Sequence, residues 1–356
     1  MKRILVVTTR QIGDVLLTTP LIHAARERWP QARIDVLGFA GTLGMLRGNG
    51  DVHELIEVPA RPGWRDAWSL VRRLWRSYDL ALVAEISDRA HLLGWAAARE
   101  RSGLVPAEGG SNWLKNRLLD HRVTSAGDKG ELHVVHEKLA LLAPWLKDMP
   151  ARPRVQPPPA AALPPDIEAS LQPGAVVLHA PSMWPYKQWP LAQFRELAQS
   201  LLERGRQVVL TGSAGERDQQ CVAALRGLAP SPQLLDASGR LDFNQLTGLL
   251  RRAALYIGPD TSVSHLAAAC GTPVVAVFGP TNPMRWAPWP SAGEQPVFVR
   301  RSLAQSSGNV TVVQSALPCV PCTRAGCEDH RESRSDCLAD IPAQRVLEQA
   351  LALLAE

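Results

Sequence analysis

Residues 255–282 have the sequence LYIGPDTSVSHLAAACGTPVVAVFGPTN, and this stretch decides the fold class. The apolar run at 255–257 predicts a strand, residues 264–269 predict a short helix, and the run at 274–278 predicts a second strand. A strand, a loop, a helix and another strand in succession form the repeating unit of a doubly wound parallel sheet. The loop at 258–263 follows a strand and opens a helix, which is where open α/β sheets bind ligands.

The same alternation extends in both directions along the chain. Before the stretch, the run at 3–9 is apolar and β-branched, which is typical of a strand buried on both faces. The further predicted strands are 33–37, 55–58, 79–84, 175–180 and 207–211, and the predicted helices are 15–29, 64–77, 191–204, 218–227, 243–253 and 343–354. We therefore expect an α/β protein of two similar nucleotide-binding halves that face each other across a cleft.

Proline marks the division between the halves. Prolines crowd residues 152–173, and proline fits neither a helix interior nor a central strand. We predict an N-terminal Rossmann-like domain at 1–155, a linker at 156–172 and a C-terminal Rossmann-like domain at 173–342. The last segment, 343–356, is expected to be a helix that packs back on the N-terminal domain.

Composition excludes several classes of protein. The chain has 356 residues, of which 46% are hydrophobic and 21% charged, so both domains can bury a core. The net charge of +5 suits a phosphate-bearing ligand or an anionic membrane surface, and no pattern of interleaved aromatic and basic residues indicates nucleic acid. No signal peptide and no apolar run near eighteen residues occurs, so we expect a cytoplasmic protein with reduced cysteines.

The loop at 258–265 predicts an anion site. Free backbone N–H groups and the positive end of a helix dipole favour a pyrophosphate there. The hydroxyl groups of Thr261, Ser262 and Ser264 add donors, and the carboxylate of Asp260 can accept hydrogen bonds from sugar hydroxyls. The alternative is that Asp260 or Thr261 simply caps the helix.

Two neighbours of this loop are weaker candidates. Thr281, in the corner after the strand at 274–278, can close the other side of the same site or belong to an ordinary turn. His265 can donate to the sugar or the phosphate, or it is a buried helix residue whose hydrogen bonds are satisfied within the fold.

Three segments resemble the motifs of one known family. ILVVTTRQIGDVLLTTPLIHAARERWP at 4–30, HAPSMWPYKQWPLAQFRELAQSL at 179–201 and GPDTSVSHLAAACGTPVVAVFGPTNPMRWAPW at 258–289 are similar to glycosyltransferase family 9, the heptosyltransferases. The resemblance implies the GT-B fold, an ADP-heptose donor, a lipopolysaccharide inner-core acceptor, inversion at the anomeric carbon and no obligatory metal. Ser262 stands where many members of the family carry glycine.

The resemblance also implies that domain 1–155 binds the acceptor and domain 173–342 the nucleotide sugar, and it assigns roles to individual residues. Asp14, after Gly13, matches the residue that acts as general base toward the acceptor hydroxyl; the alternative is a helix cap. Lys187 is expected to neutralise the leaving diphosphate, or it is a solvated loop lysine. Glu216 lies where a carboxylate can bind both ribose hydroxyls. The alternative is a glutamate in the first turn of a helix, where the helix dipole stabilises its negative charge.

Four cysteines form a separate candidate site. Cys319, Cys322, Cys327 and Cys337 have the spacing C-x2-C-x4-C-x9-C. Four thiolates can hold a structural zinc ion or an iron–sulfur cluster, and the alternative is four reduced thiols, two of them a redox pair. Cys221 and Cys270 are expected to be packing residues.

One predicted helix combines tryptophan and arginine. The segment 64–76 contains three tryptophans and four arginines, which is compatible with a helix lying on an anionic membrane or, as we favour, with a core-facing apolar stripe and a basic outer face. A second group, Trp113, Lys115, Arg117, His121 and Arg122, with Arg89 as a further candidate, can meet the phosphates of a lipid-linked acceptor. The expected partners are ADP-heptose, this acceptor and the cytoplasmic face of the inner membrane.

Four other functions compete with this one. A sugar-nucleotide epimerase or hydrolase of a GT-B-like fold would act without an acceptor, and a family 9 transferase could use another sugar. A nicotinamide oxidoreductase is disfavoured because no G-x-G-x-x-G follows the first strand. A non-catalytic sugar-binding or lipid-binding protein would need neither Asp14 nor Lys187.

Overall fold

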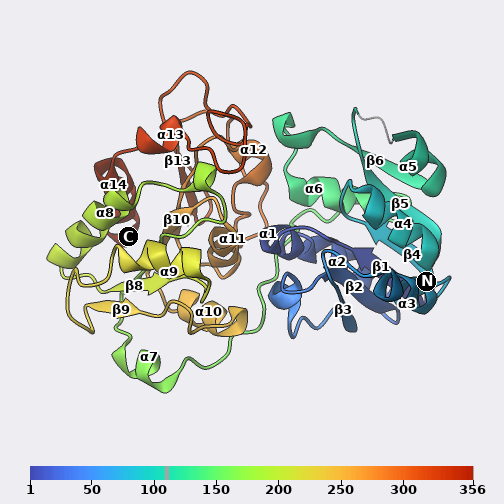
Figure 1. Cartoon of the computed structure of the whole chain (residues 1–356), viewed down its shortest axis with the longest axis horizontal. Helices are drawn as coiled ribbons and strands as arrows, with labels where there is room; N and C mark the ends of the chain where they lie inside the picture. Colours follow the sequence, from blue (N-terminus) through green and yellow to red (C-terminus); the bar gives the residue numbers. More distant parts are fainter. Residues whose placement is uncertain (109–111, 356) are drawn as a thin grey trace. The chain divides into compact units, whose positions relative to one another are not determined.

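The chain folds into two compact α/β units (Figure 1). The computed structural model describes residues 1–108 and 112–355. The first unit is Met1–Pro158 and the second is Pro159–Glu356. Within the described residues no helix is both long and apolar enough to span a bilayer.

The first unit is built on a six-stranded sheet in the order β3-β2-β1-β4-β5-β6, and every pair of neighbouring strands is parallel. Ile4, Leu5, Val6 and Val7 of the central strand β1 are fully buried, as the continuous apolar run predicts for a strand covered on both faces. The strands are β1 (Arg3–Val7), β2 (Arg33–Phe39), β3 (Glu54–Val58), β4 (Tyr78–Val83), β5 (Ala98–Pro106) and β6 (His121–Ser125). The α-helices are α1 (Ile12–Leu16), α2 (Thr19–Arg28), α3 (Trp64–Leu74), α4 (Asp88–Ala97), α5 (Asn112–Leu118) and α6 (Val134–Leu139).

The helix predicted at 15–29 is two helices. Helix α1 ends at Leu16, and Thr18 is the N-cap of α2. Pro20 causes the break, because a proline has no N–H and its ring clashes with the preceding helical turn, whereas the first turn of a new helix accepts it. The short separate α1 therefore carries Gly13 and Asp14 in its first turn, soon after β1.

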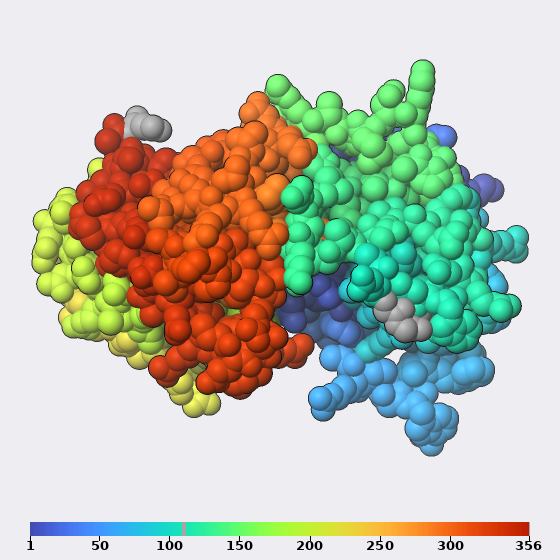
Figure 2. Space-filling model, turned by 90° about the horizontal axis from the view of Figure 1, so that it is seen from above, coloured from blue at the N-terminus to red at the C-terminus, as the bar shows by residue number. Residues whose placement is uncertain are grey.

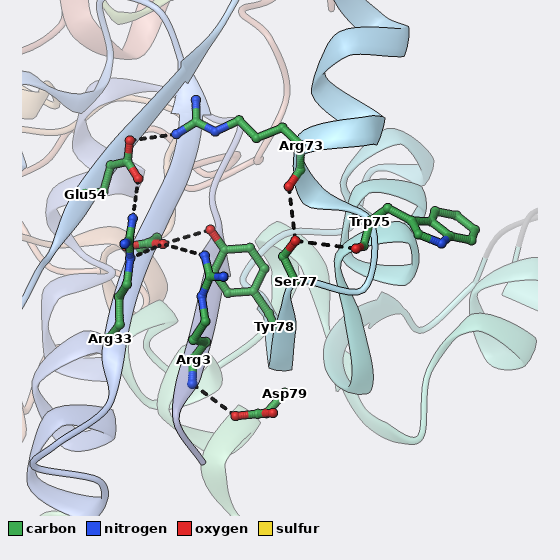
Figure 3. A network of polar contacts seen from close by, with 9 residues as sticks. Arg3, Arg33, Glu54, Arg73, Trp75, Ser77, Tyr78 and Asp79 are labelled. Atoms are coloured by element: carbon green, nitrogen blue, oxygen red, sulfur yellow. Dashed lines mark hydrogen bonds and ion pairs between the residues drawn. The ribbon is translucent and has the colours of Figure 1, made fainter.

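A network of polar contacts lies at the amino-terminal edge of this sheet (Figure 3). Asp35 on β2 is fully buried, accepts a hydrogen bond from the hydroxyl of Tyr78 at 2.8 Å, and lies 3.1 Å from Nε of Arg33. Burial and the adjacent Asp35 raise the pKa of Tyr78 above its ordinary value, so the phenol stays a donor. Arg33 and Arg73 both bind Glu54, each at 2.6 Å, which ties the end of α3 to β3.

The second unit contains a seven-stranded sheet in the order β12-β13-β11-β10-β7-β8-β9. All pairs are parallel except β12 with β13, an antiparallel hairpin whose turn contains Gly308 with φ +55°. The strands are β7 (Val176–His179), β8 (Val208–Thr211), β9 (Leu234–Asp236), β10 (Leu255–Pro259), β11 (Val274–Val277), β12 (Ala304–Ser307) and β13 (Val310–Val313). The α-helices are α7 (Pro165–Ser170), α8 (Leu191–Glu203), α9 (Glu216–Ala223), α10 (Phe243–Leu250), α11 (Ser262–Ala269), α12 (Pro283–Trp286), α13 (Asp336–Ala339) and α14 (Ala343–Ala355).

Helix α14 packs against α8 of the second unit. Val346, Leu347 and Ala350 are buried in the same core cluster as Phe194 and Leu197 of α8. A contact of this helix with the first domain, which we expected, stays a prediction, and Glu356 lies outside the described residues. The proline-rich stretch contains α7, which begins at Pro165 and is joined to the rest of its unit by an ion pair between Glu168 and Arg252 at 2.6 Å.

The segment 64–76 has the core-facing apolar stripe and the exposed arginines that we expected, but its tryptophans are not part of the stripe. Trp64, Trp68 and Trp75 are 76%, 62% and 51% exposed. The core face of α3 is occupied instead by Leu74, which is fully buried, and by half-buried Leu70, four residues apart on one side of the helix. Two leucines fill the space over the sheet, so the larger indoles point outward.

Candidate active site

The residues predicted for nucleotide binding lie at one edge of the second sheet. Parallel strands β11, β10, β7 and β8 are neighbours, so the loops that follow them meet at their carboxyl ends. Thr281 follows β11, Asp260 follows β10, Lys187 follows β7, and Glu216 follows β8. The strand order reverses between β10 and β7, the type of position at which open α/β sheets bind ligands.

Lys187 and Asp260 form an ion pair at this reversal. The distance from Nζ of Lys187 to Oδ2 of Asp260 is 2.6 Å, and the side chains are 26% and 7% exposed. Burial would raise the pKa of Asp260, but the ammonium of Lys187, together with His265 and Thr281, holds it below its ordinary value. The pair is therefore ionised at neutral pH, and Lys187 is no freely solvated loop lysine.

The loop after β10 opens α11 as the sequence predicts. Thr261 is the N-cap residue but its side chain makes no capping hydrogen bond, and Asp260 lies outside the cap position, so simple capping by either residue is wrong. Ser262 is the first residue of α11. The first backbone N–H groups of a helix have no partner within it, so those of α11 are oriented toward the loop. Ser264 is fully buried and its hydroxyl donates to the carbonyl oxygen of Pro259 at 2.5 Å, so this hydroxyl is engaged within the loop.

Glu216 and His265 differ in exposure. Glu216 is exposed at the first position of α9, and its carboxylate accepts a hydrogen bond from Gln220 at 3.1 Å. His265 is buried on α11, where its charge would act on Asp260. The structure therefore brings Lys187, Asp260, Thr281 and His265 together, while the carboxylate of Glu216 points to solvent.

In the first unit, Asp14 follows β1 at the corresponding reversal between β1 and β4. It is the third residue of α1, whose N-cap is Gln11, so Asp14 does not cap its helix. The carboxylate is 13% exposed and lies 3.7 Å from Nε of Arg10. Gly13, directly before it, is half-buried and its carbonyl oxygen accepts from the N–H of Leu17 at 2.9 Å.

Lys138, a buried lysine that the sequence did not single out, contacts Asp14. Nζ of Lys138 on α6 donates to the carbonyl oxygen of Asp14 at 2.6 Å and to Oγ1 of Thr18 at 2.8 Å, and lies 4.0 Å from Oδ1 of Asp14. Burial lowers the pKa of Lys138 to about 8, although Asp14 partly opposes this. These contacts fix α1 to α6 and hold a positive charge beside the Asp14 carboxylate.

Glu85 is a second residue that was missed. It follows β4, is buried, and accepts hydrogen bonds from the N–H of Thr9 at 2.9 Å and from the hydroxyl of the same residue. Burial raises the pKa of Glu85, an effect that Thr9 and Arg10 oppose and the nearby Asp14 increases. A charged residue placed directly after an apolar strand was the available signal in the sequence.

The four clustered cysteines lie in one irregular segment of the second unit. Cys337 is buried, and burial together with Cys322, Cys319 and Cys327 raises its pKa to about 12, so the thiols are near enough to interact. The N–H of Asp336 donates to Sγ of Cys327 at 3.3 Å. No group of three or more His, Cys, Asp or Glu side chains in the described ranges is arranged to hold a metal ion, so the predicted ligand set does not fit as it stands.

The other two cysteines are mainly packing residues, as expected. Cys221 is buried and Cys270 is half-buried, and burial raises the pKa of both thiols. Among the described residues all six cysteines are free thiols.

The acceptor-side candidates are spread over the first unit. Lys115 is buried and paired with Asp88 at 2.7 Å, Arg89 donates to the carbonyl oxygens of Pro59 and Ala60, and His121 lies 3.2 Å from Glu100. Trp113 is 64% exposed on α5. These pairings give Lys115, Arg89 and His121 structural contacts, and no single cluster of phosphate ligands results.

Comparison with known proteins identifies the family. The family model "Glycosyltransferase family 9 (heptosyltransferase)" matches residues 67–328. A lipopolysaccharide heptosyltransferase 3 of Escherichia coli is 28% identical over 290 residues, covering 78% of this chain and 83% of the relative.

Two solved structures have the same fold. The E. coli ADP-heptose lipopolysaccharide heptosyltransferase II has a TM-score of 0.71 at 23% identity and covers 100% of this chain and 99% of that one. The E. coli heptosyltransferase WaaC with ADP has a TM-score of 0.69 at 20% identity, with 99% of both chains covered. From the family match and these folds, the chain belongs to glycosyltransferase family 9, the heptosyltransferases of lipopolysaccharide biosynthesis, and has their GT-B fold.

Proposed function

We propose that the chain transfers heptose from ADP-heptose to a lipopolysaccharide inner-core acceptor, with inversion at the anomeric carbon. The Lys187–Asp260 pair at the reversal of the second sheet is the observation that carries this proposal. Two relatives of known structure support an ADP-linked heptose as donor: one is an ADP-heptose lipopolysaccharide heptosyltransferase, and the other, WaaC, was solved with ADP.

The donor half of the reaction belongs to the second unit. The ammonium of Lys187, oriented by Asp260, and the N–H groups at the start of α11 supply positive charge to the ADP oxygens as the bond to the anomeric carbon breaks. Glu216 binds the ribose hydroxyls, and Ser262 and Thr281 donate to the phosphates or the sugar. Ser264 has a supporting role, because its hydroxyl is used inside the loop.

The acceptor half belongs to the first unit. Asp14 takes the proton from the acceptor hydroxyl while the oxygen of that hydroxyl forms the new bond to the anomeric carbon. ADP leaves with the electron pair of the broken bond. A single displacement inverts the configuration at that carbon.

The direct test is turnover with defined donors. ADP-heptose and a heptose-deficient lipopolysaccharide acceptor should give ADP and a glycosylated lipid whose new linkage has the configuration opposite to that of the donor. Turnover only with a UDP-sugar or GDP-sugar would overturn the donor assignment. Consumption of ADP-heptose at an equal rate without acceptor would instead favour an epimerase or hydrolase.

The cysteine segment is part of the proposal as a structural site. The spacing of Cys319, Cys322, Cys327 and Cys337 is the observation that supports a zinc ion or an iron–sulfur cluster. Binding would require the thiolates to move into a ligand arrangement that they do not have here. No metal or other cofactor is proposed for the transfer step, because Lys187 and α11 supply the positive charge.

The proposed partners follow from the substrate. A lipid-linked acceptor places the enzyme at the cytoplasmic face of the inner membrane, as a peripheral protein of the cytoplasm. Nucleic acid is not among the proposed partners.

A further inference from the structure

The exposed tryptophans of the chain are concentrated on one part of the first unit. The sequence contains 11 tryptophans. Among the described residues, the strongly exposed ones are Trp64, Trp68, Trp75 and Trp113, on α3, directly after α3 and on α5. Exposed indoles are costly in water, so their concentration indicates a surface that is covered by something else.

Helix α3 has three distinct sides. Leu70 and Leu74 face the core of the first unit. Trp64 and Trp68, one turn apart, form the apolar outer side. Arg65 and Arg72, seven residues apart, are both exposed and lie on the next side of the helix.

The helices next to α3 continue this surface. Helix α3 packs against α4 and α4 packs against α5, and right-handed crossovers place all three on the same face of the sheet. The rings of Trp75 and Trp95 meet edge to face with centroids 5.8 Å apart, which joins the end of α3 to α4. Leu92, three residues before Trp95, is 47% exposed. An apolar strip therefore runs from α3 onto α4.

The segment around α3 is predominantly positive. Residues 61–76 contain five arginines and one aspartate, so this segment has a net charge of +4 (5 − 1) out of +5 for the chain. Arg73 is bound to Glu54, and Figure 3 shows this pair together with the ring of Trp75, which points away from the network. Among the residues that the structure describes, Arg61, Arg65 and Arg72 have no carboxylate partner at ion-pair distance.

The geometry points to a docking surface, formed by the outer sides of α3 and α4 and by Trp113 of α5, for a bilayer of anionic phospholipids; we propose that this surface holds the protein on the membrane. Tryptophan prefers the boundary between headgroups and acyl chains, since its ring is apolar and its N–H is polar. The adjacent arginines attract anionic headgroups. Figure 2 shows the α3 region, in light blue, projecting from the rest of the first unit, so a flat surface can reach it.

This inference extends the proposed function, because a lipid-linked acceptor lies in a bilayer, but it can be tested without turnover. The probe is a lipid vesicle that contains no lipopolysaccharide and no sugar nucleotide. Wild-type protein should co-sediment with phosphatidylcholine vesicles containing about 30% phosphatidylglycerol and much less with pure phosphatidylcholine. Binding should weaken as salt is added, because screening reduces the headgroup attraction.

Two pairs of substitutions separate the apolar and the charged contributions. W64S/W68S should lower the partition coefficient between vesicles and water about tenfold or more, since two indoles no longer enter the membrane interface. R65Q/R72Q should lower it roughly 25-fold on anionic vesicles, at about fivefold per arginine, and hardly change the weak binding to neutral ones. R195Q/R204Q is the matched control and should bind as wild type does, because both arginines are exposed, one on α8 of the second unit and one at its C-cap, and α8 has no tryptophan.

The fold of each variant is checked by circular dichroism and by ADP binding, which depends on the second unit. Vesicle binding by W64S/W68S equal to that of wild type would overturn the proposal. So would a wild-type dimer that W64S/W68S splits and that binds no vesicles, because the surface would then be an interface between two copies of the chain. Loss of transferase activity with every donor, beside intact vesicle binding, would refute the proposed function alone.

Discussion

Asp14 lies between two cations of different character. Arg10 is exposed, while Lys138 is buried and burial lowers its pKa to about 8. Lys138 is held by two hydrogen bonds, one to α1 and one to its neighbour Thr18. At the residue scale, then, the proposed base has one exposed and one buried cationic partner.

Asp14→Asn should leave ADP binding and the fold intact and lower turnover by roughly 10²–10⁴-fold, the usual effect of removing a general base. The amide has nearly the same shape as the carboxylate but does not accept the proton of the acceptor hydroxyl. Steady-state kinetics and ADP titration measure both effects, with the exposed Asp148→Asn as the control. Wild-type turnover in Asp14→Asn would show that another group takes the proton.

Lys138→Met should change the pH dependence of stability. The unfolded lysine keeps its proton up to a pH of about 10.5, whereas the folded one loses it near 8, so the folded state pays the cost of a buried charge only below pH 8. The free energy of unfolding of wild type, relative to Lys138→Met, should therefore rise between pH 8 and 10.5, by up to about 3 kcal/mol.

Urea unfolding of both proteins at several pH values measures this difference, and the exposed Lys147→Met serves as the control. Turnover of Lys138→Met should also fall about tenfold, because α1 loses its attachment to α6 and Asp14 is positioned less well. Parallel stability curves for wild type and Lys138→Met would contradict the shifted pKa.

At the scale of helices and strands, the sequence predicts best where the apolar pattern is continuous. Strands β1, β7, β10 and β11 are four or five residues long and almost wholly buried, and each was predicted within a residue or two. Strand β5 begins ARERS and β12 is AQSS, and neither was predicted, since sheet pairing rather than apolar periodicity makes them strands.

In the candidate site, too, the sequence predicts the residues that follow a local pattern and not those brought together by tertiary contacts. Lys187, Asp260 and Asp14 follow predicted strands and stand in family motifs, so their positions at the sheet edges follow from the pattern. Lys138 contacts Asp14 across 124 residues and Glu85 contacts Thr9 across 76, and no local signal encodes such pairs.

The cysteine segment gives a prediction at this scale. Protein purified without chelator should contain about one zinc, or iron with sulfide, per chain if the four thiolates bind metal. Cys322→Ser should lose it, while Cys221→Ser, outside the segment, should retain it. A metal-free preparation that is folded and active would refute the metal site. Catalysis itself should survive chelation of added magnesium, since Lys187 and α11 provide the positive charge.

At the scale of the whole molecule, the proposed catalytic groups are divided between the units. Asp14 belongs to the first unit, and Lys187, Glu216 and Asp260 belong to the second. A reaction that needs both sets requires the units to come together around donor and acceptor, which also keeps water from the donor.

Small-angle scattering should therefore show a smaller radius of gyration when ADP-heptose analogue and acceptor are both present than with neither. We expect the proline-rich junction to permit this movement, because its prolines disfavour a long helix that would fix the units rigidly. An unchanged radius, together with an unliganded crystal structure that already holds Asp14 against the donor loop, would remove the case for closure.

The chain divides between Pro158 and Pro159, and each unit has its own sheet, its own core and its own strand reversal. Under the proposed assignment, one half of the gene encodes the choice of acceptor and the other the choice of donor. Recombination at this junction would let a bacterium exchange one choice while inheriting the other unchanged. New surface sugars could then arise by reassortment of halves, without waiting for point mutations to rebuild a site.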